Sequence, residues 1–145
     1  MRISPYTHRI AVNAYLLQDD KFLLLQRKIE PYIWSPPGGR LKRDEDPISG
    51  LIREVKEETN YDIEVVAPVN TWFGYWRAKL LLSIDYLTYQ VGGDFKISSE
   101  HKDYAWVSID DLQKGESQWL KWYGVIPVAQ SFGLMTINHI WTYVA

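Results

Sequence analysis

The first thirty residues carry two apolar runs joined by a short acidic turn. The first run reads HRIAVNAYLLQ over residues 8–18, and the second reads KFLLLQRK over residues 21–28, with Asp19 and Asp20 between them. Two β-prone runs on either side of a short polar break are typical of a hairpin. The pattern therefore predicts a pair of antiparallel strands at the start of the fold.

A loop and then a helix are expected next. Residues 31–39, PYIWSPPGG, contain three prolines and two glycines, so we expect a shaped loop without regular structure. Asp46 offers a side-chain oxygen as N-cap, and Pro47 suits the first helical position. Apolar residues then recur at helical spacing, which predicts an amphipathic helix over about residues 47–59. They are Ile48, Leu51, Ile52 and Val55.

The remainder of the chain reads as a sheet followed by helical segments. The stretches YDIEVV, TWFGYWRA and KLLLSIDYLTYQV are rich in β-branched and aromatic residues and predict strands. A polar loop runs from Gly92 to about Asp103, before the short strand YAWVS and a helical turn in SIDDLQKG. Mixed helical spacings over residues 127–144 predict a closing helix. With no repeat or linker in sight, residues 1–145 are expected to form one sandwich of helices on a sheet.

Composition and charge limit the classes of function that the chain can have. A chain that is 46% apolar and 23% charged is ordinary for a globular protein. Because cysteine is absent, any metal must be held by oxygen or imidazole. The start lacks a signal pattern and no stretch approaches the about 20 apolar residues that span a bilayer, so we expect a cytoplasmic protein without membrane partners. A net charge of −2 disfavours bulk nucleic-acid binding.

The acidic residues are concentrated on and around the expected helix. Residues 44–64 hold eight of the 18 acids. Three of them, Glu54, Glu57 and Glu58, fall within about 100° of one another around the helix axis. Like charges at this spacing repel. A divalent cation would remove that penalty, and oxygen ligands of this kind suit Mg²⁺ or Mn²⁺.

These acids also belong to a longer spaced pattern. The residues stand at the spacing of the Nudix box, G-x5-E-x7-R-E-U-x-E-E-x-G-U, and they are Gly39, Glu45, Arg53, Glu54, Val55, Glu57, Glu58 and Tyr61. The chain resembles a Nudix hydrolase of the MutT-like pyrophosphohydrolase kind. The box covers residues 39–61, and the order of the flanking elements extends the likeness to about residue 112. The resemblance implies an α/β fold, a Nudix-type α/β/α sandwich with a mixed β-sheet, as a single domain over residues 1–145.

The resemblance also implies site roles. Glu54, Glu57 and Glu58 would hold one or more Mg²⁺ ions, with Mn²⁺ as a substitute, joined by the Gly38 carbonyl. Glu100, six residues before Trp106, is expected as a further metal ligand. The implied catalytic set is Arg53, Glu54, Glu57 and Glu100, in which either Glu54 or Glu100 is the general base. Arg53 would orient Glu54 or bridge to Glu45, and His101 is expected at the surface.

Two positions depart from the family pattern. Asn60 stands where the family usually has Gly at the helix end, and Asn is the next best residue for a left-handed cap, so we expect a small stability cost there. Lys42 stands where many relatives carry an acid. That change alters the charge near the phosphates and could bias substrate choice.

Aromatic and basic side chains supply candidates for substrate binding. Alternation in TWFGYW puts Trp72 and Trp76 on one face of a strand and Phe73 and Tyr75 on the other, so half of this set is expected to be core. One Trp is expected to stack on a base, and the sequence leaves open which. Arg40 is expected among the phosphate-binding cations. The substrate-binding candidates are Trp34, Arg40, Trp72 and Trp76, and the further basic candidates are Arg27, Lys42, Arg43 and Arg77.

The function expected from the resemblance is Mg²⁺-dependent cleavage of a pyrophosphate bond in a nucleoside diphosphate linked to another group. Nucleotide sugars, nucleoside triphosphates and dinucleoside polyphosphates all remain open, and ADP-ribose is demoted because Trp76 stands where ADP-ribose cleavers typically carry proline. The alternative is a catalytically silent Nudix-fold nucleotide sensor, and a weaker one is a partner-binding domain that uses its aromatic surface. A homodimer is compatible with the aromatic-rich strands.

Overall fold

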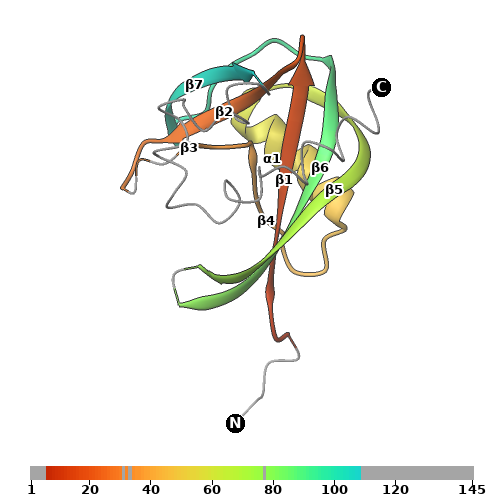
Figure 1. The fold of residues 1–145 in the computed structure, drawn as a ribbon, viewed down its shortest axis with the longest axis vertical. Helices are drawn as coiled ribbons and strands as arrows, with labels where there is room; N and C mark the ends of the chain where they lie inside the picture. Colours follow the sequence, from red (N-terminus) through yellow and green to blue (C-terminus); the bar gives the residue numbers. More distant parts are fainter. Residues whose placement is uncertain (1–5, 31, 33, 77, 109–145) are drawn as a thin grey trace.

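The fold is organised around its first strand. The computed structural model describes residues 6–30, 32, 34–76 and 78–108, except for the side chain of Trp76. Strand β1 (Arg9–Gln18) runs through the middle of the molecule, and helix α1 (Pro47–Thr59) lies against it (Figure 1). β1 pairs antiparallel with β2 (Lys21–Arg27), antiparallel with β4 (Gly38–Arg40) and parallel with β6 (Lys79–Gly92).

The other strands extend this mixed sheet on both sides. β2 also pairs antiparallel with β3 (Trp34–Ser35) and with β7 (His101–Ser108). β5 (Asp62–Trp76) pairs with β6 along an antiparallel ribbon that projects from the body of the molecule (Figure 1). An α/β fold with a mixed sheet is therefore confirmed. The expected closing helix and the helical turn after Ser108 lie outside the described residues.

The hairpin prediction is confirmed at both of its strands. Gln18 pairs with Lys21, so the connection is a two-residue turn. Asp19 and Asp20 both have positive φ, 51° and 60°, as a type I′ turn requires. These two acidic residues therefore hold a backbone shape that Asn and Gly adopt more readily.

The proline-rich loop is more regular than we expected. Strands β3 and β4 both fall inside residues 31–39 or at their end, so the prediction of a loop without regular structure is wrong for those residues. Their hydrogen bonds go to β2 and β1, which lie outside the loop itself. Between them the Pro37 carbonyl accepts a bond from the Ala14 N–H at 2.7 Å, which fixes the loop to the central strand.

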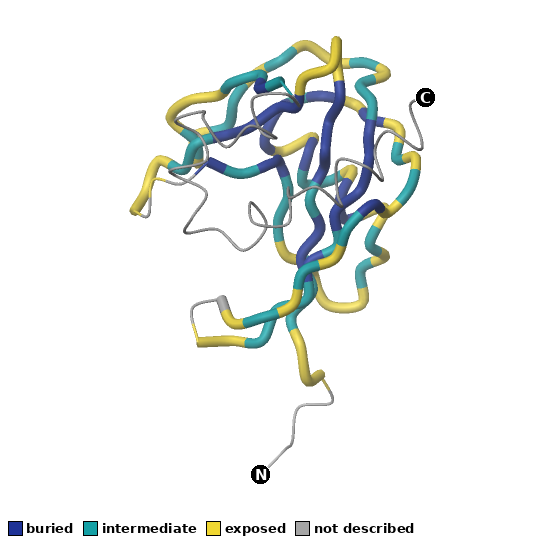
Figure 2. Tube along the Cα trace, viewed as in Figure 1, coloured by how far each residue is buried: buried dark blue, intermediate teal, exposed yellow. Residues whose placement is uncertain are grey.

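The core lies between α1 and one face of the sheet. Leu51 and Val55 of the helix are fully buried against β1 residues such as Val12 and Leu16 (Figure 2). Burial of each such side chain contributes about 1.5–3 kcal/mol. Ile48 and Ile52 belong to the same apolar arc of the helix, but their side chains are 46% and 40% exposed. Half of the arc therefore lies outside the core.

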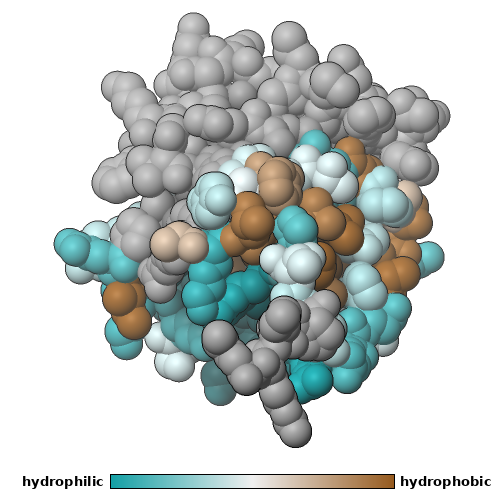
Figure 3. All heavy atoms as spheres, turned by 90° about the horizontal axis from the view of Figure 1, so that it is seen from below, coloured by the Kyte–Doolittle hydropathy of each residue, from teal (hydrophilic) through white to brown (hydrophobic). Residues whose placement is uncertain are grey.

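The projecting ribbon differs from the expected half-buried strand. Phe73 and Tyr75 are exposed, so the half of the TWFGYW set on their face is not core. A Cβ on Gly74 would fall 2.6 Å from the Trp72 ring, which places that ring over Gly74. From below, hydrophobic residues gather on this end of the molecule among hydrophilic ones (Figure 3). Within the described part of the chain, α1 is too short and polar to cross a bilayer.

Candidate active site

Helix α1 is capped as its sequence indicates. The Asp46 carboxylate accepts the Ser49 N–H at 2.9 Å, and Pro47 occupies the first turn. At the other end Asn60 has φ 63° and ψ 8°, so the expected left-handed cap is confirmed. The helix presents Glu54 to Gly39 and Glu58 to Gly38 of β4 and to His101 of β7.

Arg53 contacts three acidic side chains of the box. Its guanidinium donates to both oxygens of Glu45, at 2.7 and 2.8 Å, and to Glu54 at 3.0 Å. It also forms the i,i+4 ion pair with Glu57 at 3.2 Å. The bond from Arg53, with one from the Lys42 N–H, lowers the pKa of Glu45 to about 2. Both roles expected of Arg53 occur in the same structure, because one guanidinium has enough donors for the two acids.

Glu58 is a buried carboxylate held by two donors from different elements. Its side chain is 7% exposed. The Gly38 N–H donates to Oε1 at 2.8 Å, and Nε2 of His101 lies 3.1 Å from Oε2. Burial raises the pKa of Glu58 well above its ordinary value, and the nearby charges of Glu54, Glu100 and Glu57 add to that effect. The charged form of Glu58 is therefore costly unless a cation is present.

His101 does not lie at the surface, so that expectation is wrong. Its side chain is 8% exposed, and its Nδ1 lies 3.1 Å from the Ser98 hydroxyl. Burial lowers the pKa of His101, which favours a neutral imidazole near pH 7. A neutral ring that accepts from Ser98 at Nδ1 carries its proton on Nε2, where it can donate to Glu58. Ser98 and His101 were missed as site residues, because no spacing connects them to Glu58.

Glu54 and Glu100 face the same region from different elements. A Cβ on Gly39 would fall 2.6 Å from the Glu54 carboxyl carbon, so a larger residue at position 39 would displace this carboxylate from its place beside β4. Burial raises the pKa of Glu54, the Arg53 bond opposes this, and the charge of Glu100 adds to it. Glu100 itself is exposed at the end of the loop before β7, where its carbonyl accepts from the Lys28 N–H at 3.0 Å.

The donor set fits a hard divalent cation in chemical kind, although the side chains do not converge on one point. Among the described residues, no three His, Asp or Glu side chains converge as a metal site. Arg53 lies against Glu54 and Glu57, and Glu58 is turned toward Gly38 and His101. The charges of neighbouring glutamates nevertheless raise the pKa values of Glu54 and Glu58, and a bound cation would stabilise their ionised forms. Glu57, 56% exposed, is free to turn toward an ion.

The substrate-binding candidates that the structure describes lie in different parts of the fold and do not form one site. Trp34 is buried at 6% exposed in β3, so it offers little of its ring to a ligand. Trp72 lies on the projecting ribbon, and the Trp76 side chain and Arg77 are outside the described residues. Arg40 lies on β4 directly after Gly39, and strand alternation directs its side chain to the face opposite to the Glu54 carboxylate.

Comparisons with a family model and with known proteins point to the same family. The NUDIX domain model matches residues 7–123. An asymmetrical bis(5′-nucleosyl)-tetraphosphatase from Caenorhabditis elegans is 32% identical over 108 residues, which cover 65% of this chain and 72% of that protein.

Solved structures agree with the family match. The MutT protein from Methanosarcina mazei Go1 has a TM-score of 0.71 at 26% identity, covering 90% of this chain and 96% of that one. An ADP-ribose pyrophosphatase from Streptococcus suis 89-1591 has a TM-score of 0.59 at 28% identity, covering 72% and 77%.

Proposed function

Because this chain belongs to the NUDIX domain family, whose relatives include hydrolases of pyrophosphate bonds, we propose that it is an Mg²⁺-dependent hydrolase of a nucleoside diphosphate linked to another group. Water would attack phosphorus and break the pyrophosphate bond. The observation that carries the proposal is the network of Arg53 with Glu45, Glu54 and Glu57 beside the buried Glu58. A solvated acidic helix face would not need a guanidinium shared by three acids.

Members of this family generally use divalent metal ions. Glu54, Glu57 and Glu58 would hold Mg²⁺ or Mn²⁺, joined by the Gly38 carbonyl and by Glu100. When bound, such an ion supplies charge neutralisation on phosphate oxygens and makes the attacking water more acidic. Glu58 contributes an oxygen whose direction is fixed by Gly38 and His101, whereas Glu57 contributes one that must turn from Arg53.

The general base is either Glu54 or Glu100. Burial raises the pKa of Glu54, and a carboxylate with a raised pKa accepts a proton more readily near neutral pH. Glu100 stands on the loop before β7, and its charge raises the pKa of Glu54. Comparison of the turnover of Glu54→Gln with that of Glu100→Gln ranks the two. A wild-type rate for Glu100→Gln removes it from the mechanism.

The test is a phosphate-release screen over nucleotide sugars, ADP-ribose, nucleoside triphosphates and dinucleoside polyphosphates with Mg²⁺ or Mn²⁺. Steady hydrolysis that stops with EDTA supports the enzyme, whereas binding of nucleotides without turnover supports the nucleotide sensor. Glu57→Gln should lower turnover about 10²-fold, because it removes a metal-binding charge and keeps the shape. Glu64→Gln, an exposed acid on β5, is the matched control and should leave turnover unchanged.

A further inference from the structure

A row of polar side chains crosses the face of the sheet that is turned away from α1. Val12 of β1 packs in the core with the helix, so alternation puts Asn13 on the opposite face. Strand register aligns Asn13 with Asp85 of β6, and Asp85 with Asn70 of β5. On its other side Asn13 stands opposite Gly38 of β4. The row therefore joins four strands and ends at the glycine that binds Glu58.

Asp85, at the centre of this row, is a fully buried carboxylate. Its Oδ1 accepts from the Asn13 amide at 2.9 Å, and the Ser83 hydroxyl lies 3.4 Å from the same oxygen. Its Oδ2 accepts from the Tyr15 hydroxyl at 2.9 Å and from the Asn70 amide at 3.0 Å. Burial raises the pKa of Asp85, and these four hydrogen bonds oppose the rise. All four donors are neutral, so the carboxylate fixes their positions without an ion pair.

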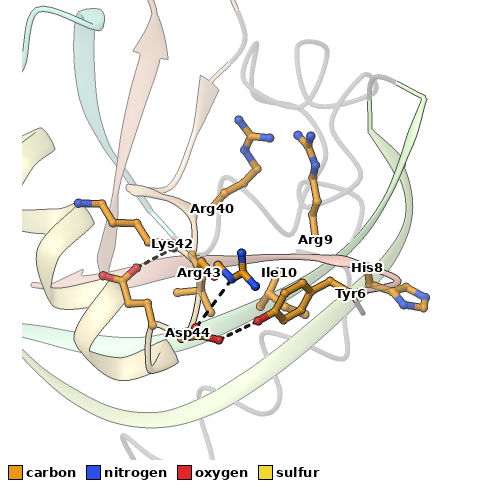
Figure 4. Close-up of a pocket in the computed structure, with 10 residues that line it drawn as sticks. Tyr6, His8, Arg9, Ile10, Arg40, Lys42, Arg43 and Asp44 are labelled. Carbon is orange, nitrogen blue, oxygen red and sulfur yellow. Dashed lines mark hydrogen bonds and ion pairs between the residues drawn. The ribbon is translucent and has the colours of Figure 1, made fainter. Parts of the chain in front are cut away.

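The cations on this face of the sheet do not account for Asp85. Arg9 and Arg40 extend side by side next to a pocket of about 580 Å³ (Figure 4). Arg40 lies opposite Ala11 and Arg9 lies two residues further along β1, which puts them about 7 Å and about 13 Å along the sheet from Asn13. Within the described part of the chain, neither forms an ion pair with Asp85. Charge compensation therefore does not explain a carboxylate at this place.

Asn13 connects Asp85 to β4. Its amide nitrogen donates to the Ser83 hydroxyl at 2.7 Å and to Asp85 at 2.9 Å. Two acceptors on one nitrogen give the side chain a single orientation, with its oxygen on the side of β4. A Cβ added to Gly38 would fall 2.7 Å from that oxygen, so the Asn13 side chain occupies the space beside this glycine.

This side-chain contact is what links Gly38 to β1. The Ala14 N–H donates to the Pro37 carbonyl at 2.7 Å, so the next pair along, Asn13 and Gly38, exchanges no backbone hydrogen bonds. Both polar groups of Gly38 then point away from β1, and its N–H donates to Glu58 at 2.8 Å. The direction of that N–H therefore depends on how closely Asn13 packs against the glycine.

We propose that Asp85 is a positioning residue for the site at α1. It holds Asn13, Asn13 holds Gly38, and Gly38 directs the carboxylate of Glu58. The inference rests on the proposed function for the role of Glu58 as a metal ligand, whereas the contacts themselves are present without metal. Asp85 touches neither ion nor substrate in this scheme, so its loss should disturb Gly38 and metal binding together.

Hydrogen exchange in EDTA tests the positioning without metal. Asn13→Ala should speed exchange of the Gly38 N–H about tenfold relative to the amides of β6, which report global stability. Asn70→Ala is the matched control, because it removes a bond of similar length to the same carboxylate from a strand that β6 and β1 separate from β4. Its relative exchange at Gly38 should equal that of the wild type. Wild-type relative exchange in a folded Asn13→Ala overturns the proposal.

Asp85 itself is tested by two kinds of substitution. Asp85→Asn keeps an acceptor for the Asn13 amide and should preserve slow exchange at Gly38. Asp85→Leu, or Asp85→Ala where the larger residue prevents folding, removes that acceptor and should speed exchange about tenfold. Slow exchange at Gly38 in either folded apolar variant overturns the role of Asp85.

Metal affinity gives the last arm. Asn13→Ala should weaken Mn²⁺ binding about tenfold, as loss of a group that orients a ligand does, and Asn70→Ala should bind as the wild type does. Electron paramagnetic resonance measures both. Faster exchange at Gly38 with unchanged Mn²⁺ affinity supports the contacts from Asp85 to Gly38 and removes the metal role of Glu58 from the proposed function. Unchanged exchange with unchanged affinity overturns the inference and leaves the proposed hydrolase intact.

Discussion

At Glu58, one carboxylate joins three separate parts of the chain. Its partners come from β4 and from the start of β7, and the Ser98 N–H donates to its own carbonyl at 3.1 Å. A buried carboxylate with donors on both oxygens keeps one orientation, because any rotation would break a hydrogen bond away from water. His101 therefore acts through Glu58 as a positioning residue, and its own position depends on Ser98.

His101→Ala should weaken Mn²⁺ binding about tenfold or more, because loss of a partner that orients a ligand typically costs this much. His101→Gln, whose amide can donate in place of Nε2, should recover part of the affinity. Mn²⁺ titration followed by electron paramagnetic resonance measures both. The exposed His8 gives the control, and equal affinity in His8→Ala and His101→Ala would show that His101 does not orient Glu58.

The raised pKa of Glu58 has a consequence for metal-free stability. Between its unfolded pKa near 4.5 and its higher folded pKa, the folded state binds more protons than the unfolded one, so stability falls as pH rises. His101, with a lowered pKa, acts in the opposite sense, but only below its ordinary value of 6.5. The difference between the wild type and a variant that cannot ionise at position 58 therefore separates the carboxylate from His101.

As pH rises above about 4.5, the melting temperature in EDTA should gain less, or fall more, in the wild type than in Glu58→Gln, which cannot ionise. The variant keeps an acceptor for the Gly38 N–H, so its fold should persist. Asp85, whose pKa burial also raises, contributes equally to both proteins and cancels in the difference. Parallel curves for the two proteins would exclude Glu58 as a titrating group in this range.

Among the elements, the end of α1 and the loop after β6 form one unit. The Asn60 side chain donates to the Asp94 carbonyl at 2.9 Å, and the Lys96 N–H donates to the Thr59 carbonyl at 2.9 Å. Gly93 has φ 82° with the Asn60 carbonyl against it, so a side chain there would be both strained and blocked. The loop that carries Ser98 and Glu100 is thus attached to the helix that carries the other glutamates.

Asn60 makes two opposing contributions to stability, the cost of a side chain at positive φ and the hydrogen bond to Asp94. Asn60→Gly removes the cost of a side chain at positive φ but also removes the bond to Asp94, so the free energy of unfolding should change by less than about 1 kcal/mol. Asn60→Ala keeps the cost and loses the bond, and it should destabilise by about 1–2 kcal/mol. Urea unfolding of the two variants measures both. A gain from Asn60→Gly well above that range would mean that the Asp94 bond contributes nothing.

Elements with local signals were predictable, and elements that depend on distant partners were not. The bounds of α1 follow from Asp46, Pro47 and Asn60, all within the helix or next to it. β3 and β4 exist only because β2 and β1 offer hydrogen bonds, and no residue in PYIWSPPGG indicates that pairing. In the site, Arg53 and the glutamates were found from spacing, whereas the contact of His101 with Glu58 joins residues that the fold alone brings together.

At the level of the whole molecule, the site is assembled from parts that the sheet holds at fixed distances. β1 bonds to the strand that carries Gly38 and to the strand that pairs with β7. Acidic side chains are therefore held near one another by the rest of the fold, at a cost in repulsion that is present before any ion binds.

Addition of Mn²⁺ or Mg²⁺ to the EDTA-treated protein should accordingly raise its melting temperature. At a concentration about 100 times Kd the stabilisation is about 2.7 kcal/mol, or roughly 5–10 °C for a chain of this size. The shift should shrink in Glu57→Gln and persist in Glu64→Gln. An equal shift in all three proteins, measured by differential scanning calorimetry, would place the ion elsewhere.

The hairpin turn at Asp19 and Asp20 is a place where substitution can raise the stability of the protein. Both residues hold positive φ in a turn that favours Asn-Gly, and they lie at the end of β1 opposite to Arg9 and Arg40. Asp19→Asn combined with Asp20→Gly should add about 1 kcal/mol of stability. That background would keep variants at buried positions such as Glu58 and His101 folded, so that a lost activity in them can be assigned to chemistry rather than to unfolding.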